Sequence, residues 1–341
     1  MLENKTTIIA EAGVNHNGSL EIAKKLVEAA STAGADYVKF QTFNPKALVT
    51  NHANLAGYQR KNSKFSKQLE MLEQLTLSHQ DHYELVKHCE LHKIKFLSTA
   101  FDPDSLQFLD TLGSSLYKIP SGEINNVPYL EMVGSLATEV IISTGMAFMS
   151  EIKNVLQIIE KSGISRDKVT VLHCTTEYPA SFSDVNLRAM NSIGSELKVR
   201  TGYSDHTLGI EVSIAAVAMG ASVIEKHFTL DQNMSGPDHK ASLNPESLYQ
   251  MIKSIRNIEI ALGDGNKRPT RIELENRKTI RKSLVASRPI LIGETFTSDN
   301  ITTKRPGTGL PADKYNDLIG RIARASYSGD EFIANEELDG K

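Results

Sequence analysis

The chain has 341 residues, of which 40% are hydrophobic, and its formal net charge is −3. This length suits one large domain and a smaller one. The near-neutral charge excludes the electrostatic footprint of a nucleic-acid-binding or membrane-surface protein, so we expect neither partner. With only Cys89 and Cys174, no run of about 20 apolar residues and no signal-peptide pattern, we expect a cytoplasmic protein whose thiols are buried and unreactive.

Eight short apolar runs alternate with longer segments of helical period. The predicted strands begin, in chain order, at Thr6, Tyr37, Lys95, Leu116, Glu139, Val169, Val199 and Val223. Amphipathic segments such as "SLEIAKKLVEAASTAG" lie between them and end in glycine, which helix C-caps prefer. Eight strand–helix units over about 260 residues predict an α/β fold, the (β/α)8 TIM barrel. The alternative is a doubly wound open sheet, but "EAGVNHNG" after the first strand lacks the G-x-G-x-x-G turn.

The remainder of the chain departs from this alternation in two places. Residues 43–76 exceed an ordinary strand-to-helix loop and predict a lid or binding segment. After Gly263 a charged, mostly polar stretch predicts a linker, partly helical, and short β-like runs broken by Gly, Pro and Asn follow it. We therefore expect a barrel at 1–263, a linker at 264–282 and a small β-rich domain at 283–341.

Polar residues concentrate at the carboxyl ends of all eight predicted strands, which is where TIM barrels carry their active sites. These residues are Glu11; Lys39 and Gln41; Ser98 and Thr99; Lys118, Ser121 and Glu123; Ser143 and Thr144; His173, Thr175, Glu177 and Tyr178; Ser204, Asp205 and His206; and Glu225 and His227. Core packing explains one such residue easily but not eight polar strand ends. The pattern therefore favours an active site at this face.

Two kinds of chemistry follow from these residues. The side chains of Lys39 and Lys118, with hydroxyl groups from Thr99, Ser121, Ser143 and Ser204, form a set suited to phosphate or carboxylate. His206 and His227 end adjacent predicted strands, so their imidazoles could share a divalent metal, with Glu225 and Asp205 beside them. Two protein ligands would leave coordination positions for water and substrate, as a Lewis acid requires. A satisfied core network, in which Glu225 pairs with a neighbouring residue, is the alternative.

Several motifs together resemble the bacterial sialic acid synthases in order and spacing. They are "EAGVNHNGS", "VKFQTF", "KIPSGE", "IISTGM", "HCTTEYP", "GYSDHT", "IEKHFTLD" and "GPDHKASL". The tail "NITTKRPGTGL" resembles the antifreeze-protein-like SAF domain, a β-clip fold, that follows the barrel in this family. The resemblance covers nearly the whole chain. It implies a transferase that condenses phosphoenolpyruvate with an N-acetylmannosamine-type sugar and releases phosphate.

The resemblance also assigns roles residue by residue. Phosphoenolpyruvate is expected at Lys39, Thr99, Lys118, Ser121, Ser143 and Ser204. The divalent metal, Mn²⁺ with Mg²⁺ or Co²⁺ as alternatives, is expected at His206 and His227. The acceptor sugar is expected at Gln41, Glu123, Tyr178, Asp238 and Arg305, the last of which would reach the site from the partner subunit of a homodimer. Glu11 and Glu225 are both candidates for positioning a metal-bound water or moving protons, and the sequence leaves that choice open.

The acceptor also stays open at this point. We place N-acetylmannosamine first, giving N-acetylneuraminate, and a 2,4-diacetamido-2,4,6-trideoxyhexose second, giving legionaminate or pseudaminate. Another phosphoenolpyruvate–aldose synthase is a weaker alternative, because it needs a second phosphate site that the sequence does not display. A barrel that binds sugar without turning it over is the alternative from a different class.

Overall fold

The computed structural model describes residues 5–55, 57, 60 and 65–339. The chain divides into two compact units, Met1–Gly263 and Asp264–Lys341, each of which is described by itself. Among the described residues, no helix is both long and apolar enough to cross a membrane.

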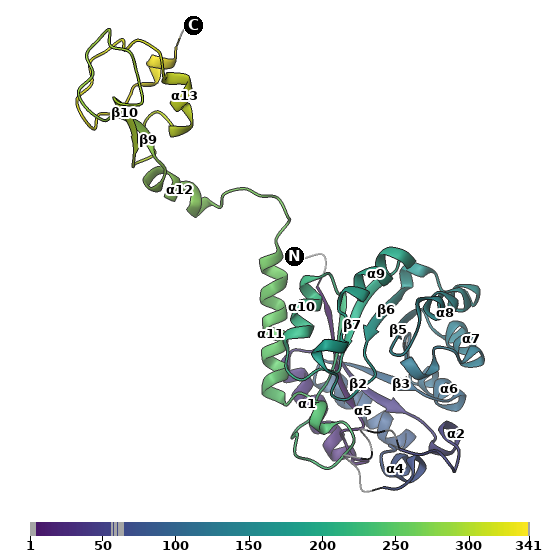
Figure 1. Cartoon of the computed structure of the whole chain (residues 1–341). Coiled ribbons are helices and arrows are strands. Elements are labelled where there is room, and N and C mark those ends of the chain that lie inside the picture. The colour runs from purple at the N-terminus through teal and green to yellow at the C-terminus, as the bar shows by residue number, and fades with distance from the viewer. Residues whose placement is uncertain (1–4, 56, 58–59, 61–64, 340–341) are drawn as a thin grey trace. The chain divides into compact units, whose positions relative to one another are not determined.

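Eight parallel strands form the centre of the first unit (Figure 1). They are β1 (Thr7–Gly13), β2 (Tyr37–Thr42), β3 (Lys95–Ala100), β4 (Leu116–Ile119), β5 (Glu139–Ser143), β6 (Val169–Cys174), β7 (Arg200–Asp205) and β8 (Val223–His227). Their order is β3-β2-β1-β8-β7-β6-β5-β4, and the two terminal strands, β3 and β4, contact each other. The sheet is therefore closed, and the predicted TIM barrel is confirmed.

Helices follow the strands and cover the outside of the barrel (Figure 1). They are α1 (Leu20–Ala33), α5 (His79–Leu91), α6 (Pro103–Thr111), α7 (Val127–Leu136), α8 (Met149–Lys161), α9 (Arg188–Leu197), α10 (Glu211–Ala218) and α11 (Pro245–Leu262). Local sequence sets their ends: Ser19 caps the start of α1 through the Ile22 amide, and Gly34 ends it with a left-handed φ of 87°. The described part of the long segment 43–76 includes the short helices α2 (Pro45–Leu48) and α4 (Gln68–Gln74).

Strand alternation separates the two faces of β8. Ile224 and Phe228 belong to the large core between the barrel and its helices, whereas Val223 belongs to a small apolar cluster with Ile9, Leu97, Ile141 and Leu172 from four other strands. Because side chains alternate along a strand, Glu225 and His227 share the face of Val223 and point into the barrel.

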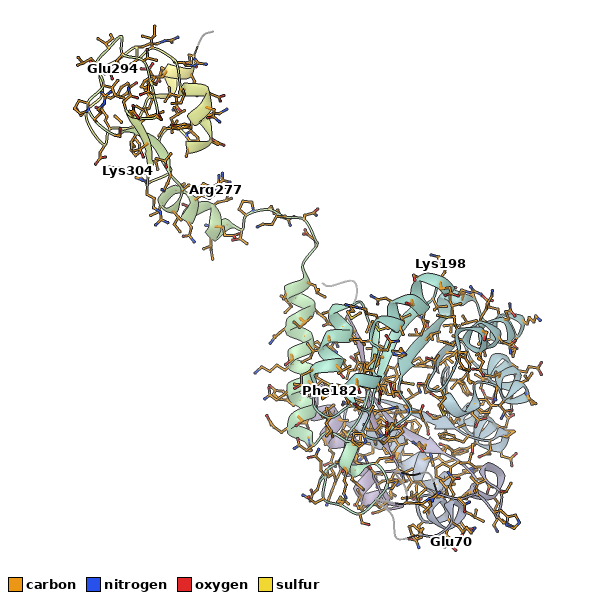
Figure 2. All side chains as sticks on the ribbon, viewed as in Figure 1. Glu70, Phe182, Lys198, Arg277, Glu294 and Lys304 are labelled. Atoms are coloured by element: carbon orange, nitrogen blue, oxygen red, sulfur yellow. The ribbon has the colours of Figure 1, made fainter. Side chains whose placement is uncertain are left out.

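The second unit begins with the polar stretch that was predicted as a linker, and that stretch contains helix α12 (Arg271–Ile280). A capping box between Thr270 and Glu273 starts this helix. Strands β9 (Ser283–Ala286) and β10 (Ile301–Lys304) then pair antiparallel, and isolated bridges and helix α13 (Tyr315–Leu318) complete the unit around a core that includes Phe296. Lys304, labelled in Figure 2, ends β10 and pairs with Asp330.

Candidate active site

A cavity of about 440 Å³ opens at the carboxyl ends of the barrel strands. Every barrel residue to which the family resemblance assigned a role in binding substrate or metal, or in moving protons, lines this cavity. These residues are Glu11, Lys39, Gln41, Thr99, Lys118, Ser121, Glu123, Ser143, Tyr178, Ser204, His206, Glu225, His227 and Asp238. Residues spread over more than 200 positions of sequence therefore meet around one space.

The strand geometry explains why these residues meet. One layer below the cavity, the barrel interior is filled by Ile9, Tyr37, Leu97, Leu116, Ile141, Leu172 and Val223. Two residues further along the same strands stand Glu11, Lys39, Thr99, Lys118, Ser143, Cys174 and Glu225. The period of two places both sets on the inner face, so an apolar layer supports a polar one. In β7 the supporting position is Gly202, where a Cβ atom would lie 2.7 Å from Leu172 Cδ2.

Two carboxylates and two lysines form a connected network at the floor of the cavity. Lys39 Nζ lies 2.7 Å from Glu11 Oε2 and 3.6 Å from Glu225 Oε2, and Lys118 Nζ lies 3.4 Å from Glu225 Oε1. Lys39 also donates to Thr99 Oγ1 at 3.1 Å. All four charged side chains are at least 95% buried, so their charges act through little water.

The two carboxylates of this network differ in proton affinity. Burial raises the pKa of Glu11, and the negative charge of Glu225 raises it further against the opposing effect of Lys39. Burial would also raise the pKa of Glu225, but Lys118 and Lys39 outweigh it and lower that pKa to about 2. Glu225 is therefore a fixed anion between two lysines, whereas Glu11 is the carboxyl group that holds a proton more readily.

The two predicted metal ligands lie side by side. The imidazole rings of His206 and His227 have centroids 5.6 Å apart, and the ring of Tyr178 lies 4.2 Å from that of His206. His206 Nδ1 lies 2.6 Å from the Thr175 carbonyl oxygen, which orients the ring and directs Nε2 toward Ser204. His227 Nδ1 is buried and has no hydrogen-bond partner among the described residues.

Burial decides the protonation of both imidazoles. It lowers the pKa of His206 to about 4 and lowers the pKa of His227 well below its ordinary value. Both rings are therefore neutral near pH 7, which is the form that binds metal. A carbonyl that fixes one ring nitrogen, as Thr175 does here, is the usual support of a metal-binding histidine. The residues present thus fit a divalent ion.

The remaining predicted residues surround the network. Ser121 Oγ accepts from the Gly145 amide at 2.8 Å, and Ser143 Oγ has no partner among the described residues and is available to a ligand. Gln41 donates to Glu11 Oε1 at 3.3 Å. Burial, reinforced by the charge of Glu11, raises the pKa of Asp238 to about 7.

One side of the cavity is apolar, and the sequence did not predict which residues form it. Its residues are Val14, Phe43, Leu48, Val49, Met71, Leu72, Leu75 and Phe101. Most come from α2, α4 and the turns beside them, within the segment that the sequence marked only as a lid or binding segment. Only the unusual length of 43–76 pointed to this segment, and length alone does not identify the side chains that face the cavity. Residues 56, 58–59 and 61–64 of that segment lie outside the described residues.

Some strand-end residues lie elsewhere. Asp205 was expected beside the histidines, but that expectation is wrong: its Oδ2 atom pairs with Lys226 Nζ at 2.9 Å on the outer face of the barrel wall. Lys226 also donates to the Thr207 carbonyl at 2.6 Å. His173 contacts the Val185 carbonyl at 2.8 Å and does not line the cavity. Arg305 belongs to the second unit, so its role in a partner's site stays a prediction.

Comparisons with known proteins agree with this architecture. The NeuB family matches residues 26–267, and the SAF domain matches residues 281–339. The chain is 51% identical to the N,N'-diacetyllegionaminic acid synthase of Campylobacter jejuni over 96% of this chain and 99% of the relative. It is 46% identical to the protein of the same name from Legionella pneumophila, over 97% and 94%.

A solved structure extends the comparison. The N-acetylneuraminic acid synthetase of Leptospira borgpetersenii, in complex with citrate, superposes with a TM-score of 0.72 at 32% identity and covers 80% of this chain and 90% of its own. The expectation of N-acetylneuraminate as first choice is therefore less well supported than its legionaminate alternative. The family resemblance itself is confirmed: the chain belongs to the NeuB family and carries a SAF domain after its barrel.

Proposed function

We propose that this NeuB-family enzyme condenses phosphoenolpyruvate with 2,4-diacetamido-2,4,6-trideoxymannose to give N,N'-diacetyllegionaminate and phosphate. The observation that carries the proposal is the 51% identity to a legionaminic acid synthase over nearly the full length of both chains. The arrangement of the cavity supports it. The lysines of the floor suit the phosphate and carboxylate of phosphoenolpyruvate, the two neutral imidazoles suit a metal that would polarise the aldehyde, and the apolar side suits the methyl groups of the sugar.

The two lysines of the cavity floor suit phosphoenolpyruvate. The ammonium groups of Lys39 and Lys118 are held in place by Glu225, and Ser143 Oγ is available to accept or donate a hydrogen bond. Orienting the phosphate and carboxylate in this way directs C3 of phosphoenolpyruvate toward the sugar. His206 and His227 would hold the divalent ion, which supplies Lewis-acid polarisation of the aldehyde of the open-chain sugar.

The reaction needs proton transfer at two points. C3 of phosphoenolpyruvate attacks the aldehyde carbon, whose oxygen gains a proton as it becomes a hydroxyl group. Water then adds at C2 and loses a proton, which gives a tetrahedral intermediate with a hydroxyl group on C2. The bond from C2 to the phosphate oxygen then breaks, the hydroxyl proton passes to the departing phosphate, and a ketone is left at C2. Glu11 is our candidate for these transfers, because its pKa is raised whereas that of Glu225 is lowered to about 2.

The apolar side of the cavity favours the diacetamido sugar over N-acetylmannosamine. A 6-deoxy sugar presents a methyl group where N-acetylmannosamine presents a hydroxymethyl group, and a second acetamido group adds another methyl. Leu48 and Val49 are half-buried, and Met71 is buried beside them. Burying a methyl group against such residues contributes favourable transfer free energy, whereas a hydroxyl group there would be left without hydrogen bonds.

The test is phosphate release from phosphoenolpyruvate with Mn²⁺, with the two sugars offered in parallel. We expect release with the diacetamido sugar, a much lower rate with N-acetylmannosamine, and loss of both rates in EDTA. Release with N-acetylmannosamine alone would reinstate N-acetylneuraminate as the product. Release with neither sugar would overturn the proposal in favour of a different acceptor or a barrel that only binds.

A variant tests the apolar side separately. Leu48→Asn should narrow the kcat/KM ratio between the two sugars by about tenfold, since one methyl group in an apolar pocket is worth roughly 1–3 kcal/mol. Leu91→Asn is the matched control, because Leu91 is an exposed leucine at the end of α5 and does not line the cavity. If the kcat/KM ratio between the two sugars were unchanged in Leu48→Asn, Leu48 would have no role in selecting the acceptor.

A further inference from the structure

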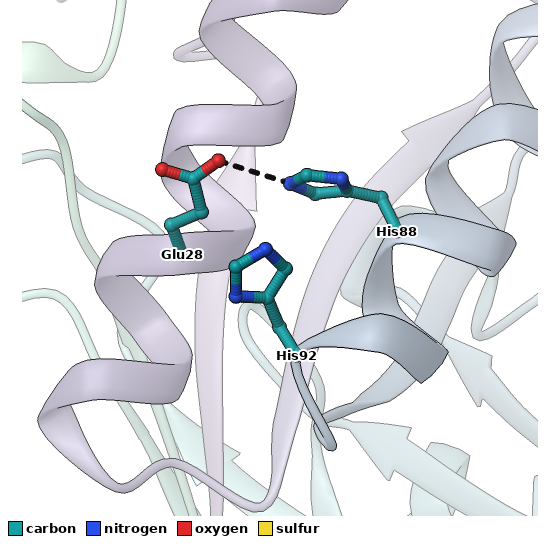
Figure 3. A group of neighbouring side chains, drawn as sticks. All are labelled: Glu28, His88 and His92. Carbon is teal, nitrogen blue, oxygen red and sulfur yellow. Dashed lines mark hydrogen bonds and ion pairs between the residues drawn. The ribbon is translucent and has the colours of Figure 1, made fainter.

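Two helices on the outside of the barrel bring three metal-binding side chains together, away from the cavity. Glu28 lies on α1, His88 lies on α5, and His92 follows the end of α5 (Figure 3). α1 and α5 pack against each other, and none of the three residues lines the cavity described above. Figure 3 shows both imidazoles turned toward the Glu28 carboxylate from the neighbouring helix.

The ligand atoms of the three residues already lie close together. One nitrogen of each histidine and one carboxylate oxygen of Glu28 all lie within 4.8 Å of one another. His88 Nε2 is 3.1 Å from Glu28 Oε1, and the two imidazole centroids are 4.5 Å apart. Ligands of a tetrahedral Zn²⁺ ion, each about 2.0–2.1 Å from it, are separated by roughly 3.3 Å. The His88–Glu28 distance is close to that value, and small side-chain rotations would bring His92 into place.

The backbone holds both histidines in position. Their spacing of four residues places them one turn apart on the same face of a helix. The His92 amide donates to the His88 carbonyl at 3.1 Å, and the His92 carbonyl accepts from Ser31 Oγ of α1 at 2.7 Å. The end of α5 is therefore fixed to α1 beside the cluster, so a metal would not have to order a loose segment.

We propose that Glu28, His88 and His92 form a second divalent-metal site, selective for Zn²⁺ and similar imidazole-preferring ions, that joins α1 to α5. Two imidazoles and one carboxylate are a ligand set that Zn²⁺ accepts, with a water as the fourth ligand. Hard ions such as Mg²⁺ prefer all-oxygen sites and are poor occupants.

The simpler interpretation is an exposed ion pair between His88 and Glu28. Such a pair contributes little to stability, and it does not account for the third side chain, His92, directed to the same point. Lys24 lies one turn before Glu28 on α1 and could compete with a metal for the Glu28 carboxylate. Its Nζ atom instead lies 3.9 Å from Glu84 Oε2. Within the described part of the chain, therefore, no lysine or arginine forms an ion pair with the cluster that a metal would have to displace.

The experiment is equilibrium dialysis of the full chain against Zn²⁺ at mildly alkaline pH, because protons compete with a metal for its ligands. Four proteins are compared: wild type, the double variant His88→Asn/His92→Asn, the double variant His206→Asn/His227→Asn, and a control, His52→Asn/His79→Asn. The control removes two exposed histidines from outside the cluster. Circular dichroism verifies that each protein is folded.

We expect the wild type and the control to bind one more Zn²⁺ ion per chain than His88→Asn/His92→Asn. The variant His206→Asn/His227→Asn should keep the outer ion, so the result does not depend on the proposed function. If His88→Asn/His92→Asn does not fold, Glu28→Gln replaces it, and its outer site should bind Zn²⁺ about tenfold more weakly than wild type. Zn²⁺ binding that is equal in stoichiometry and affinity in wild type and in the folded cluster variant would overturn the proposal.

Discussion

Strand β8 carries two buried charge clusters, one on each face, and they differ in how completely their polar atoms are paired. On the outer face, Lys226 contacts Asp205 Oδ2 and the Thr207 carbonyl, and Ser213 donates to the same Asp205 oxygen at 2.7 Å. On the inner face, Glu225 meets Lys39 and Lys118 at longer distances of 3.6 and 3.4 Å beside an open cavity.

The difference separates a structural role from a binding role. The outer cluster is fully buried, and both its lysine and its carboxylate oxygens have partners, as buried ions need if they are only to hold a fold together. The inner cluster leaves Ser143 Oγ and His227 Nδ1 without partners among the described residues. Unpaired buried polar groups are costly, so their presence beside a cavity indicates that a ligand completes them.

The largest effect is expected from breaking the outer cluster. Lys226→Met leaves the Asp205 carboxylate buried without its cation, which should lower the free energy of unfolding of the barrel by about 3–5 kcal/mol. Denaturant titration followed by circular dichroism measures it. The double variant Lys226→Met/Asp205→Asn should recover much of the loss, because no uncompensated charge remains. If the single variant were as stable as wild type, the outer pair would not support the fold.

The inner cluster should respond in the opposite way. Lys118→Met should lower kcat/KM for phosphoenolpyruvate by about 10²–10³-fold, the effect of removing one preorganised polar group from a reacting centre. Its stability should fall less than that of Lys226→Met, because Glu225 keeps Lys39 as a second cation, whereas Lys226 is the one ion-pair partner of Asp205 among the described residues. A loss of stability like that of Lys226→Met, with kcat/KM retained, would make the inner cluster structural as well.

The sequence predicted the inner face of β8 because the period of a strand is local. The alternation of Glu225, Lys226 and His227 is enough to place the first and third on one face. The same alternation places Asp205 on the face opposite to Ser204, but the sequence prediction grouped Asp205 with its chain neighbour His206 instead. The partner of Asp205 could not be predicted in this way, because it depends on the register of β7 against β8, where Asp205 lies opposite Lys226. Proximity in sequence was misleading there.

The apolar side of the cavity was less accessible to prediction than the polar floor. Leu48, Met71 and Leu72 reach the cavity only because α2 and α4 fold across the barrel mouth, and no periodicity in 43–76 specifies that contact. The sequence could not predict the different proton affinities of Glu11 and Glu225 either. They depend on the distances of the two carboxylates from Lys39 and Lys118, and these four residues come from four separate strands.

The smallest effect concerns Asp238, on the cavity side but outside the lysine network. Its folded pKa is raised to about 7 by burial and by Glu11, whereas an unfolded aspartate titrates near 3.9. Between these values the folded protein binds the extra proton, so this residue makes folding progressively less favourable as pH rises through that window. Asp238→Asn should remove that dependence. Relative to wild type, the variant should gain at least the roughly 1.4 kcal/mol of one pKa unit between pH values near 4 and near 8. Urea titrations of metal-depleted protein across the window measure the difference. A constant difference between the two proteins would mean that Asp238 is ionised throughout, paired like the outer cluster.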